Sequence, residues 1–193
     1  MCYICAVTVR IVTDSTCDLS PELVKEFGIT VVPIHVYFGH DEFVDGVTIS
    51  TKEFYERLTD HGARLPRTSA PSSGAFRDVY EMLARETDQI VSIHAAAQLS
   101  GTYNSALVGS ETVSTPCHIE VIDSTNVSLG LGLLVVQAAT MASDGATIDD
   151  IKQVIESEAP RTRLFGALGT LEYLHRGGGV SEGPPPILAL CYM

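Results

Sequence analysis

Short apolar runs alternate with amphipathic segments along most of the chain. Runs rich in β-branched residues predict buried strands at Val9–Thr13, 29–39, Gln89–His94 and His118–Asp123. These strands are apolar at nearly every position, which is typical of strands covered on both faces. Pro33 interrupts the second run, and its missing N–H predicts an edge strand or a bulge there.

Helical spacing of apolar residues, together with capping residues, predicts the segments between the strands to be helices. The predicted helices are 21–27 after Ser20, 50–59 with a Ser50/Glu53 capping box, 73–86, one from about 103 to 113, an apolar helix after Asp123, and one that begins at Thr147/Asp150 and ends before Pro160. The remaining segments, 41–48 and 64–73, are predicted to be turn and loop, and Arg163–Leu168 is predicted to be extended.

This alternation of strands and helices predicts an α/β fold. Right-handed crossovers place helices on both faces of a parallel sheet, so we expect a three-layer α/β/α domain. The stretch Leu129–Met141 is strongly apolar, but it follows a strand directly and contains glycines and polar residues. It is therefore predicted to be a buried helix that packs on the sheet, and no integral membrane segment is expected.

Composition narrows the classes of partner. The chain has 193 residues and a formal net charge of −12, and 45% of its residues are hydrophobic. Such a chain can bury a sizeable core, and its acidic surface disfavours nucleic acid. The five cysteines are an odd number without a secretory leader, which favours a reduced, cytoplasmic protein. Cys2 and Cys5 form a C-x-x-C pair without two further ligands nearby, so no metal is expected.

Hydroxyl-rich loops follow the strands or precede the helices. These loops are Asp14-Ser15-Thr16, Thr68-Ser69-Ala70-Pro71-Ser72, Ser100-Gly101-Thr102 and Asp123-Ser124-Thr125. Ligands of open parallel sheets bind outside the carboxyl ends of the strands, and helix N-termini offer free N–H groups there. The loops therefore predict a site for a small anion, either a carboxylate or a phosphate. Capping and turn formation alone would explain any one of them.

Other chemistries find less support. There is no G-x-G-x-x-G after the first strand, no Walker lysine motif and no G-x-S-x-G elbow. Cys17 is expected to be a turn or core thiol, and His94 a structural residue. An enzyme acting on a phosphorylated small molecule remains an alternative, with Asp14 and Asp123 as its possible bases. A non-binding truncated fragment is a third hypothesis.

Several segments resemble the DegV family. They are the opening VRIVTDSTCDLSPELVKEFG, RTSAPSSGAF, SIHAAAQLSGTYNSA, IEVIDSTNVSLGLGLLVVQAA and LFGALGTLEYLHRGGG, and together they cover about Val9–Gly179 in order. The resemblance implies a two-domain α/β fold and a fatty-acid-binding carrier that is not itself an enzyme and needs no cofactor. It further implies that the bound long-chain fatty acid is presented to a separate fatty acid kinase for phospholipid synthesis.

By position in these motifs, Thr68 and Ser100 resemble the hydroxyls that bind the carboxylate, and Arg176 resembles an arginine near the head group. Ser15, Ser124, Gly101 and Thr102 are expected as neighbours of the site. The apolar helix after Asp123 is expected to help line an acyl tunnel.

The chain also departs from the family pattern. Ala96 and Ala97 replace a usual pair of serines, Gly179 stands where an arginine is usual, and the residues after Val180 are unlike the family. We therefore expect an N-terminal extension at 1–8, a DegV-like domain at 9–160, the start of a second α/β domain at 161–180 and an atypical tail at 181–193. On this expectation the chain is truncated at its C-terminal end.

Overall fold

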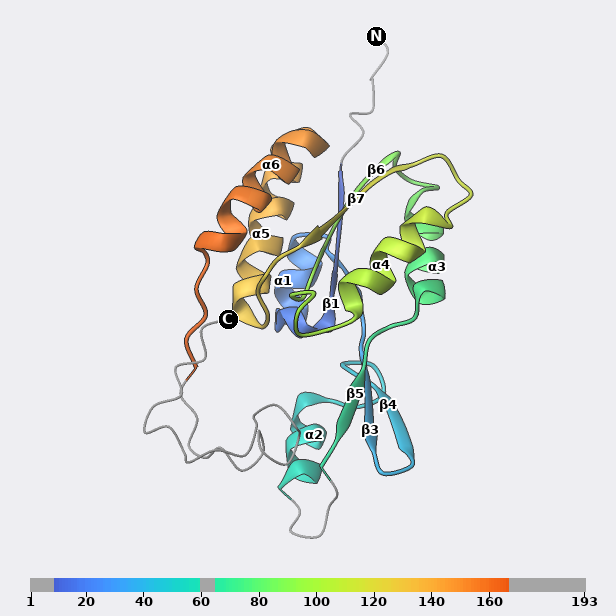
Figure 1. Ribbon diagram of the computed structural model, residues 1–193, viewed down its shortest axis with the longest axis vertical. Coiled ribbons are helices and arrows are strands. Elements are labelled where there is room, and N and C mark those ends of the chain that lie inside the picture. The colour runs from blue at the N-terminus through green and yellow to red at the C-terminus, as the bar shows by residue number, and fades with distance from the viewer. Residues whose placement is uncertain (1–8, 60–64, 167–193) are drawn as a thin grey trace.

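The computed structural model describes residues 9–59 and 65–166 (Figure 1). Its strands are β1 Arg10–Asp14, β2 Thr30–Val32, β3 His35–Phe38, β4 Asp41–Val44, β5 Arg67–Ser69, β6 Gln89–His94 and β7 His118–Asp123. Its α-helices are α1 Pro21–Glu26, α2 Thr51–Leu58, α3 Ser73–Leu83, α4 Thr102–Glu111, α5 Leu129–Ser143 and α6 Ile148–Glu158. Short 3₁₀ turns occupy Ser15–Cys17 and Ala159–Arg161.

The main sheet has four strands in the order β2-β1-β6-β7, and every neighbouring pair is parallel. Its two central strands, β1 and β6, pair with Ile11 opposite Val91. All the carboxyl ends of the strands therefore meet at one edge, as parallel pairing requires. The predicted parallel sheet is confirmed.

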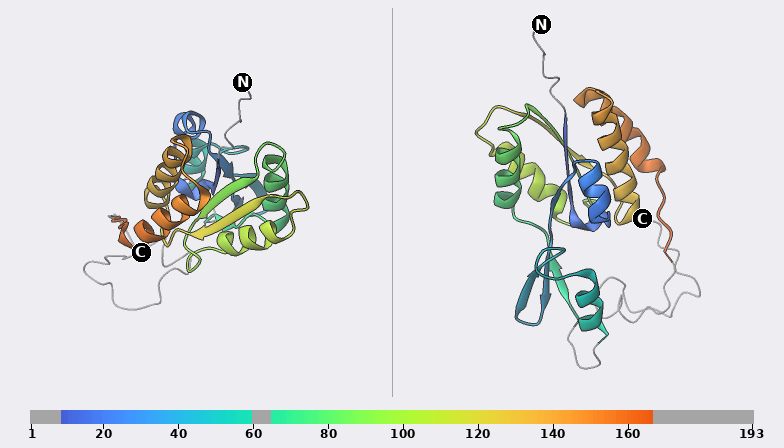
Figure 2. Two further views of the ribbon diagram at one scale, coloured as in Figure 1. Left: turned by 90° about the horizontal axis from the view of Figure 1, so that it is seen from above. Right: turned by 180° about the vertical axis from the view of Figure 1, so that it is seen from behind.

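Helices cover both faces of this sheet, and the three-layer architecture is confirmed (Figures 1 and 2). Helices α5 and α6 pack on one face, where Leu131, Leu134 and Ile151 are buried, and α1 contributes Val24 to the same side. Helices α3 and α4 cover the other face through Phe76, Tyr80 and Ala106. Burial of these apolar side chains is the main stabilising contribution to the layers.

The helix boundaries follow from local capping. The hydroxyl of Ser20 accepts a hydrogen bond from the Leu23 N–H at the start of α1, and Pro21 occupies its first turn. Gly28 follows that helix with a φ of 60°, a conformation that favours glycine. Capping boxes at Ser50/Glu53 and Thr147/Asp150 begin α2 and α6.

A second sheet departs from the sequence prediction. Strands β4, β3 and β5 form a three-stranded antiparallel sheet in the order β4-β3-β5. The prediction of one strand at 29–39 is wrong. Pro33 has no N–H to donate to a neighbouring strand, and the N–H of Ile34 donates to Ser15 Oγ at 3.1 Å rather than to a strand. The chain thereby leaves the main sheet and turns into β3.

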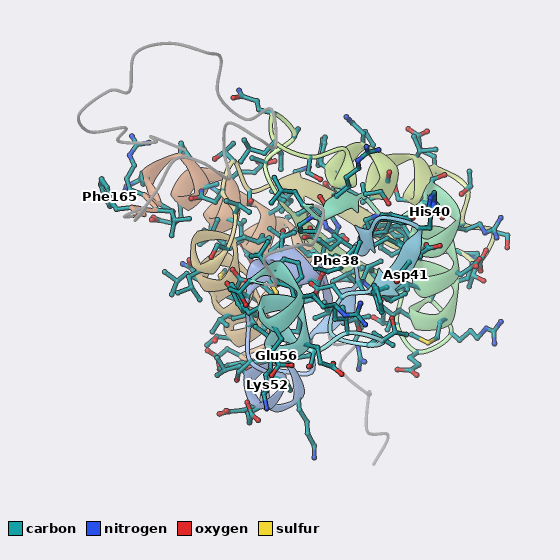
Figure 3. All side chains as sticks on the ribbon, turned by 90° about the horizontal axis from the view of Figure 1, so that it is seen from below. Phe38, His40, Asp41, Lys52, Glu56 and Phe165 are labelled. Atoms are coloured by element: carbon teal, nitrogen blue, oxygen red, sulfur yellow. The ribbon has the colours of Figure 1, made fainter. Side chains whose placement is uncertain are left out.

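The predicted turn and loop at 41–48 and 64–73 are correspondingly wrong where β4 and β5 form. This small sheet is only partly buried, so β4 and β5 carry polar side chains and lack the apolar runs by which buried strands are predicted. Figure 3 shows Phe38 and Asp41 on the hairpin and Lys52 and Glu56 on α2, and Phe165 lies apart from both. Phe38 meets Phe54 of α2 edge-to-face at 5.7 Å between ring centroids, so α2 packs on this sheet.

Two further segments complete the fold. Arg163–Leu168 was predicted to be strand-like, and that prediction is wrong at Arg163–Gly166, where no strand forms; the last residues of the segment lie outside the described part. Helix α5 has 15 residues and packs against β1, β6 and α6. None of the helices within 9–59 and 65–166 has the length and apolar character needed to cross a membrane.

Candidate functional site

A cavity of about 180 Å³ lies at the carboxyl edge of the main sheet, where that sheet meets the small one. Both Thr68 and Ser100, the two hydroxyls that the sequence favoured most, line it. The other lining residues come from the end of β5, from the turns and loops after β1, β2, β5 and β6, and from the loop before α5, namely Thr16, Ile34, Ser69, Ala70, Ala95, Leu99 and Val127. The cavity therefore brings together segments that are far apart in the sequence.

Thr68 reaches this cavity from the small sheet. It lies in the middle of β5, opposite Val36 of β3 in the antiparallel ladder. The side chain is exposed, and its hydroxyl makes no hydrogen bond to the described residues. It is therefore free to donate to a ligand or to accept from one.

Ser100 lies on the other wall, in the loop before α4. Its Oγ accepts a hydrogen bond from the Thr102 N–H at 3.2 Å and lies 2.8 Å from Thr102 Oγ1. Thr102 is fully buried, so its role is to hold Ser100 rather than to face the cavity. Gly101 between them has a φ of −72°, and a Cβ added there would lie 3.9 Å from Ala70 Cβ. Neither its conformation nor steric crowding requires glycine at this position.

The remaining predicted site residues lie elsewhere. Ser15 Oγ accepts from the Ile34 N–H, and Ser15 lines a separate hollow of about 570 Å³ between α1 and the start of the small sheet. Ser124 is fully buried, where its hydroxyl donates to Asn126 O at 3.0 Å and accepts from Asn126 N. Neither residue lines the 180 Å³ cavity, and the hydroxyl of each is engaged with the main chain. Arg176 lies outside the described residues.

Thr16 and Ser69 are polar residues of the cavity that were not among the predicted site residues. The signal was present in the Asp14-Ser15-Thr16 motif, but the motif does not say which hydroxyl faces the ligand. The 3₁₀ turn over Ser15–Cys17 turns Ser15 toward Ile34 and Thr16 toward the cavity. Both the N–H and the hydroxyl of Thr16 donate to Asp14 Oδ1.

Behind Thr16, a chain of buried polar side chains runs through the sheet. Asp14 Oδ2 accepts from the Ala95 N–H at 3.1 Å and lies 2.9 Å from His94 Nδ1. The opposite ring nitrogen of His94 lies 2.7 Å from Ser92 Oγ, which in turn lies 2.8 Å from the Tyr80 hydroxyl. All these side chains are fully buried except that of Thr16.

Asp14 is ionised in this setting. Burial raises the pKa of its carboxyl, but the hydrogen bond and the coulombic attraction of His94, together with the hydrogen bonds from Thr16 and Ala95, outweigh burial and lower it below the ordinary value. Since its carboxylate is fully buried, Asp14 is not an accessible base. Cys17 is a core thiol, as expected, and burial raises its pKa to about 11.

A second hollow shares one lining residue, Leu99, with the cavity. Leu99 lines both the 180 Å³ cavity and a hollow of about 470 Å³ whose walls include Ala96, Ala159 and Pro160. Leu99 itself is 54% exposed. Among the described residues, no group of three or more His, Cys, Asp or Glu side chains is arranged to hold a metal ion.

Comparison with known proteins places these features in context. The sequence profile described as the DegV family of uncharacterised proteins matches residues 8–190. A DegV domain-containing protein of Caldanaerobacter subterraneus subsp. tengcongensis is 38% identical over 174 residues, which are 90% of this chain and 61% of that protein. The chain thus spans about three fifths of that relative's length.

Two solved structures share the fold. A fatty acid (stearic acid)-binding protein from Eubacterium ventriosum superposes with a TM-score of 0.83 at 33% identity, covering 88% of this chain and 59% of that one. A DegV family protein from Thermus thermophilus, described as fatty acid binding, gives a TM-score of 0.79 at 32% identity over 89% of this chain and 60% of that one. Both coverages again leave a large part of the longer protein unmatched.

Proposed function

Because the chain belongs to the DegV family, we propose that it binds a long-chain fatty acid with its carboxyl head group in the 180 Å³ cavity, at Thr68 and Ser100. One observation carries the proposal. The two hydroxyls are 32 positions apart in the sequence, on β5 and before α4, yet they line one cavity at the carboxyl edge of the sheet. Ligands of parallel α/β sheets bind at this edge.

The size of the cavity suits a head group rather than a whole lipid. Pockets that enclose a drug-sized ligand measure roughly 300–1,000 Å³, whereas this cavity measures about 180 Å³. The acyl chain must therefore continue along an apolar surface outside it. Leu99 and Val127 line the cavity, and Leu129 and Leu133 at the start of α5 are 57% and 69% exposed. These side chains support a path for the acyl chain along α5.

The proposed role is that of a carrier. Thr68 is exposed at the mouth of the cavity, so a bound head group would be accessible to a second protein. Following the family resemblance, we propose that this second protein is a fatty acid kinase and that the product enters phospholipid synthesis. The accessible base that an enzyme acting on a phosphorylated molecule would need is not supplied by Asp14, whose carboxylate is fully buried.

Lipid extraction tests the proposal directly. The protein purified from bacteria should release a long-chain fatty acid that mass spectrometry identifies, and the delipidated protein should rebind oleate or palmitate. Failure of both measurements would refute fatty acid binding by this chain.

A double substitution tests the location of the head group. Thr68→Ala with Ser100→Ala should weaken fatty acid binding by about fivefold to 150-fold, because each of the two lost hydrogen bonds contributes about 0.5–1.5 kcal/mol. A matched control is Thr140→Ala with Ser157→Ala, since these exposed hydroxyls only bond carbonyls of their own helices. Equal affinities of the two double variants would place the head group elsewhere.

A further inference from the structure

Four hydroxyl side chains line the proposed head-group cavity, those of Thr16, Thr68, Ser69 and Ser100. Hydrogen bonds behind two of them determine where their protons point. A hydroxyl has one proton to donate and two lone pairs that accept. The cavity therefore presents a definite pattern of donors and acceptors to a head group.

Thr16 presents an acceptor. Its hydroxyl bonds to Asp14 Oδ1, and an ionised carboxylate only accepts, so the Thr16 proton is directed at Asp14. What Thr16 Oγ1 offers to the cavity is consequently a lone pair. A ligand atom that contacts it favourably must carry a hydrogen.

The hydrogen bonds behind Asp14 hold its carboxylate in place. Tyr80 bonds only to Ser92 among the described residues, so its buried proton belongs on Ser92 Oγ. Ser92 Oγ lies beside Nε2 of His94, and Nδ1–H of His94 donates to Asp14 Oδ2. Asp14 Oδ1 is therefore left to accept from Thr16.

Ser100 presents a donor. The buried hydroxyl of Thr102 needs an acceptor, and Ser100 Oγ is the one within reach at 2.8 Å among the described residues. Since Ser100 Oγ also accepts from the Thr102 N–H, both of its lone pairs are engaged. Its own proton is free to point into the cavity.

We propose that this cavity binds the fatty acid in its protonated, neutral form, with the acid O–H donated to Thr16 and the carbonyl oxygen accepting from Ser100. The inference rests on the proposed function and deepens it. An ionised carboxylate has no proton for Thr16, and it would be separated from the carboxylate of Asp14 by a single hydroxyl. Like charges at that range, together with loss of water, disfavour the ionised form of a carboxyl group. Asp14 is thus a positioning residue that acts through Thr16.

A primary amide is the matching probe because it carries the same pattern, a carbonyl acceptor and an N–H donor, without titrating. Binding of decanamide and decanoate to the delipidated chain should be compared between pH 6 and pH 8. Free carboxylic acids have a pKa near 4, so the neutral acid becomes about tenfold scarcer with each pH unit in this range. We expect the apparent Kd of decanoate to rise about a hundredfold from pH 6 to pH 8, while that of decanamide stays constant.

The amide also controls for titration of the protein. The ionisable groups on the elements around the cavity include Asp14 and His94 behind Thr16, Cys17 next to Thr16, His35 opposite Ser69, and Arg67 next to Thr68. Any effect of these groups on the fold or on the cavity would change decanamide binding as well. The ratio of the two Kd values therefore reports the charge of the ligand.

Two variants test the assignment to Thr16. Thr16→Val keeps the shape of the side chain but removes the acceptor, so the preference for decanamide over decanoate at pH 8 should fall at least fivefold. Thr16→Ser should restore it. If Thr16→Val does not fold, the measurement on the unaltered protein decides alone.

The outcomes separate this inference from the proposed function. Decanoate that binds as tightly as decanamide at pH 8, or more tightly, would overturn the neutral head group and indicate a cationic partner such as Arg176. Fatty acid binding would still stand in that case. Absence of binding by either probe, and by oleate, would overturn both proposals.

Discussion

His94 and Asp14 form a fully buried pair across the two central strands of the main sheet, with Nδ1 of the imidazole 2.9 Å from Oδ2 of the carboxylate. The two residues end β6 and β1, respectively, and so lie at the carboxyl edge directly behind the candidate cavity. A buried carboxylate is costly unless it is hydrogen-bonded, and here His94, Thr16 and Ala95 all donate to it. The pair therefore links the stability of the sheet to the geometry of the site.

Replacing Asp14 should destabilise the protein. In Asp14→Asn one accepting oxygen becomes an N–H₂ group that faces a donor, so we expect a loss of about 1.5–3 kcal/mol in the free energy of unfolding. Urea denaturation followed by circular dichroism measures it. The matched control is Asp88→Asn, at an exposed position. A loss of stability no larger than that of the control would show that the Asp14–His94 pair contributes little to the free energy of unfolding.

The same carboxylate makes stability depend on pH in acid. The pKa of Asp14 in the folded protein lies below its ordinary value of 3.8 because the hydrogen bonds that it accepts outweigh burial. Its contribution is therefore fully present above pH 3.8 and is lost as the pH falls through the lower folded pKa. The difference in stability between the unaltered protein and Asp14→Asn should narrow only in that acidic range. A difference that narrowed toward alkaline pH would contradict the assignment.

Gly132 is where α5 approaches the turn after β1 most closely. A Cβ at this position would lie 2.6 Å from the Cys17 carbonyl oxygen and 3.1 Å from Leu19 Cδ2. Gly132→Ala should therefore destabilise the protein by about 1–3 kcal/mol through overpacking. Gly74→Ala in α3 is the control, because its nearest neighbour, Ser72 Oγ, is 3.7 Å away, and alanine there should stabilise by up to about 1 kcal/mol. Thermal unfolding of both variants tests the contrast in sign.

Glu81 should titrate at unusually low pH. Hydrogen bonds from the Ser114 and Thr115 hydroxyls and from the Ser114 N–H lower the pKa of its carboxyl to about 2. Thr115→Val removes one donor and should raise that pKa toward its ordinary 4.5. Carboxyl ¹³C chemical shifts recorded against pH measure the change. An unchanged pKa would mean that Thr115 does not hold the carboxylate in solution.

Cys17 should resist alkylation in the folded protein. Its side chain is 2% exposed and burial raises the pKa of its thiol to about 11, so little thiolate forms at pH 8. Iodoacetamide followed by peptide mass spectrometry should find Cys17 unmodified in native protein and modified in urea. Cys117 is more exposed and should react faster than Cys17. Rapid native labelling of Cys17 would show that the turn after β1 opens readily.

Features that local interactions control could be predicted from the sequence. Three of the four main strands, the ends of α1, α2 and α6, and the α/β layering all follow from apolar runs, glycine stops and capping residues such as Ser20 and Thr147. These signals act within a few residues, so they can be interpreted without knowing the rest of the fold. The motifs also pointed to Thr68 and Ser100, which the structure places in one cavity.

The division of roles among the hydroxyl loops depends on the tertiary structure. The small sheet was not recognised in the sequence because two of its strands, β4 and β5, are short and largely polar, and its β3–β5 pairing joins segments about 30 positions apart. Ser15 bonds to Ile34 while its neighbour Thr16 faces the cavity, and that choice depends on where the chain leaves the main sheet at Pro33. His94, a structural residue in the sequence interpretation, orients Asp14 and through it Thr16. Such relationships arise from long-range packing, for which a local pattern carries no signal.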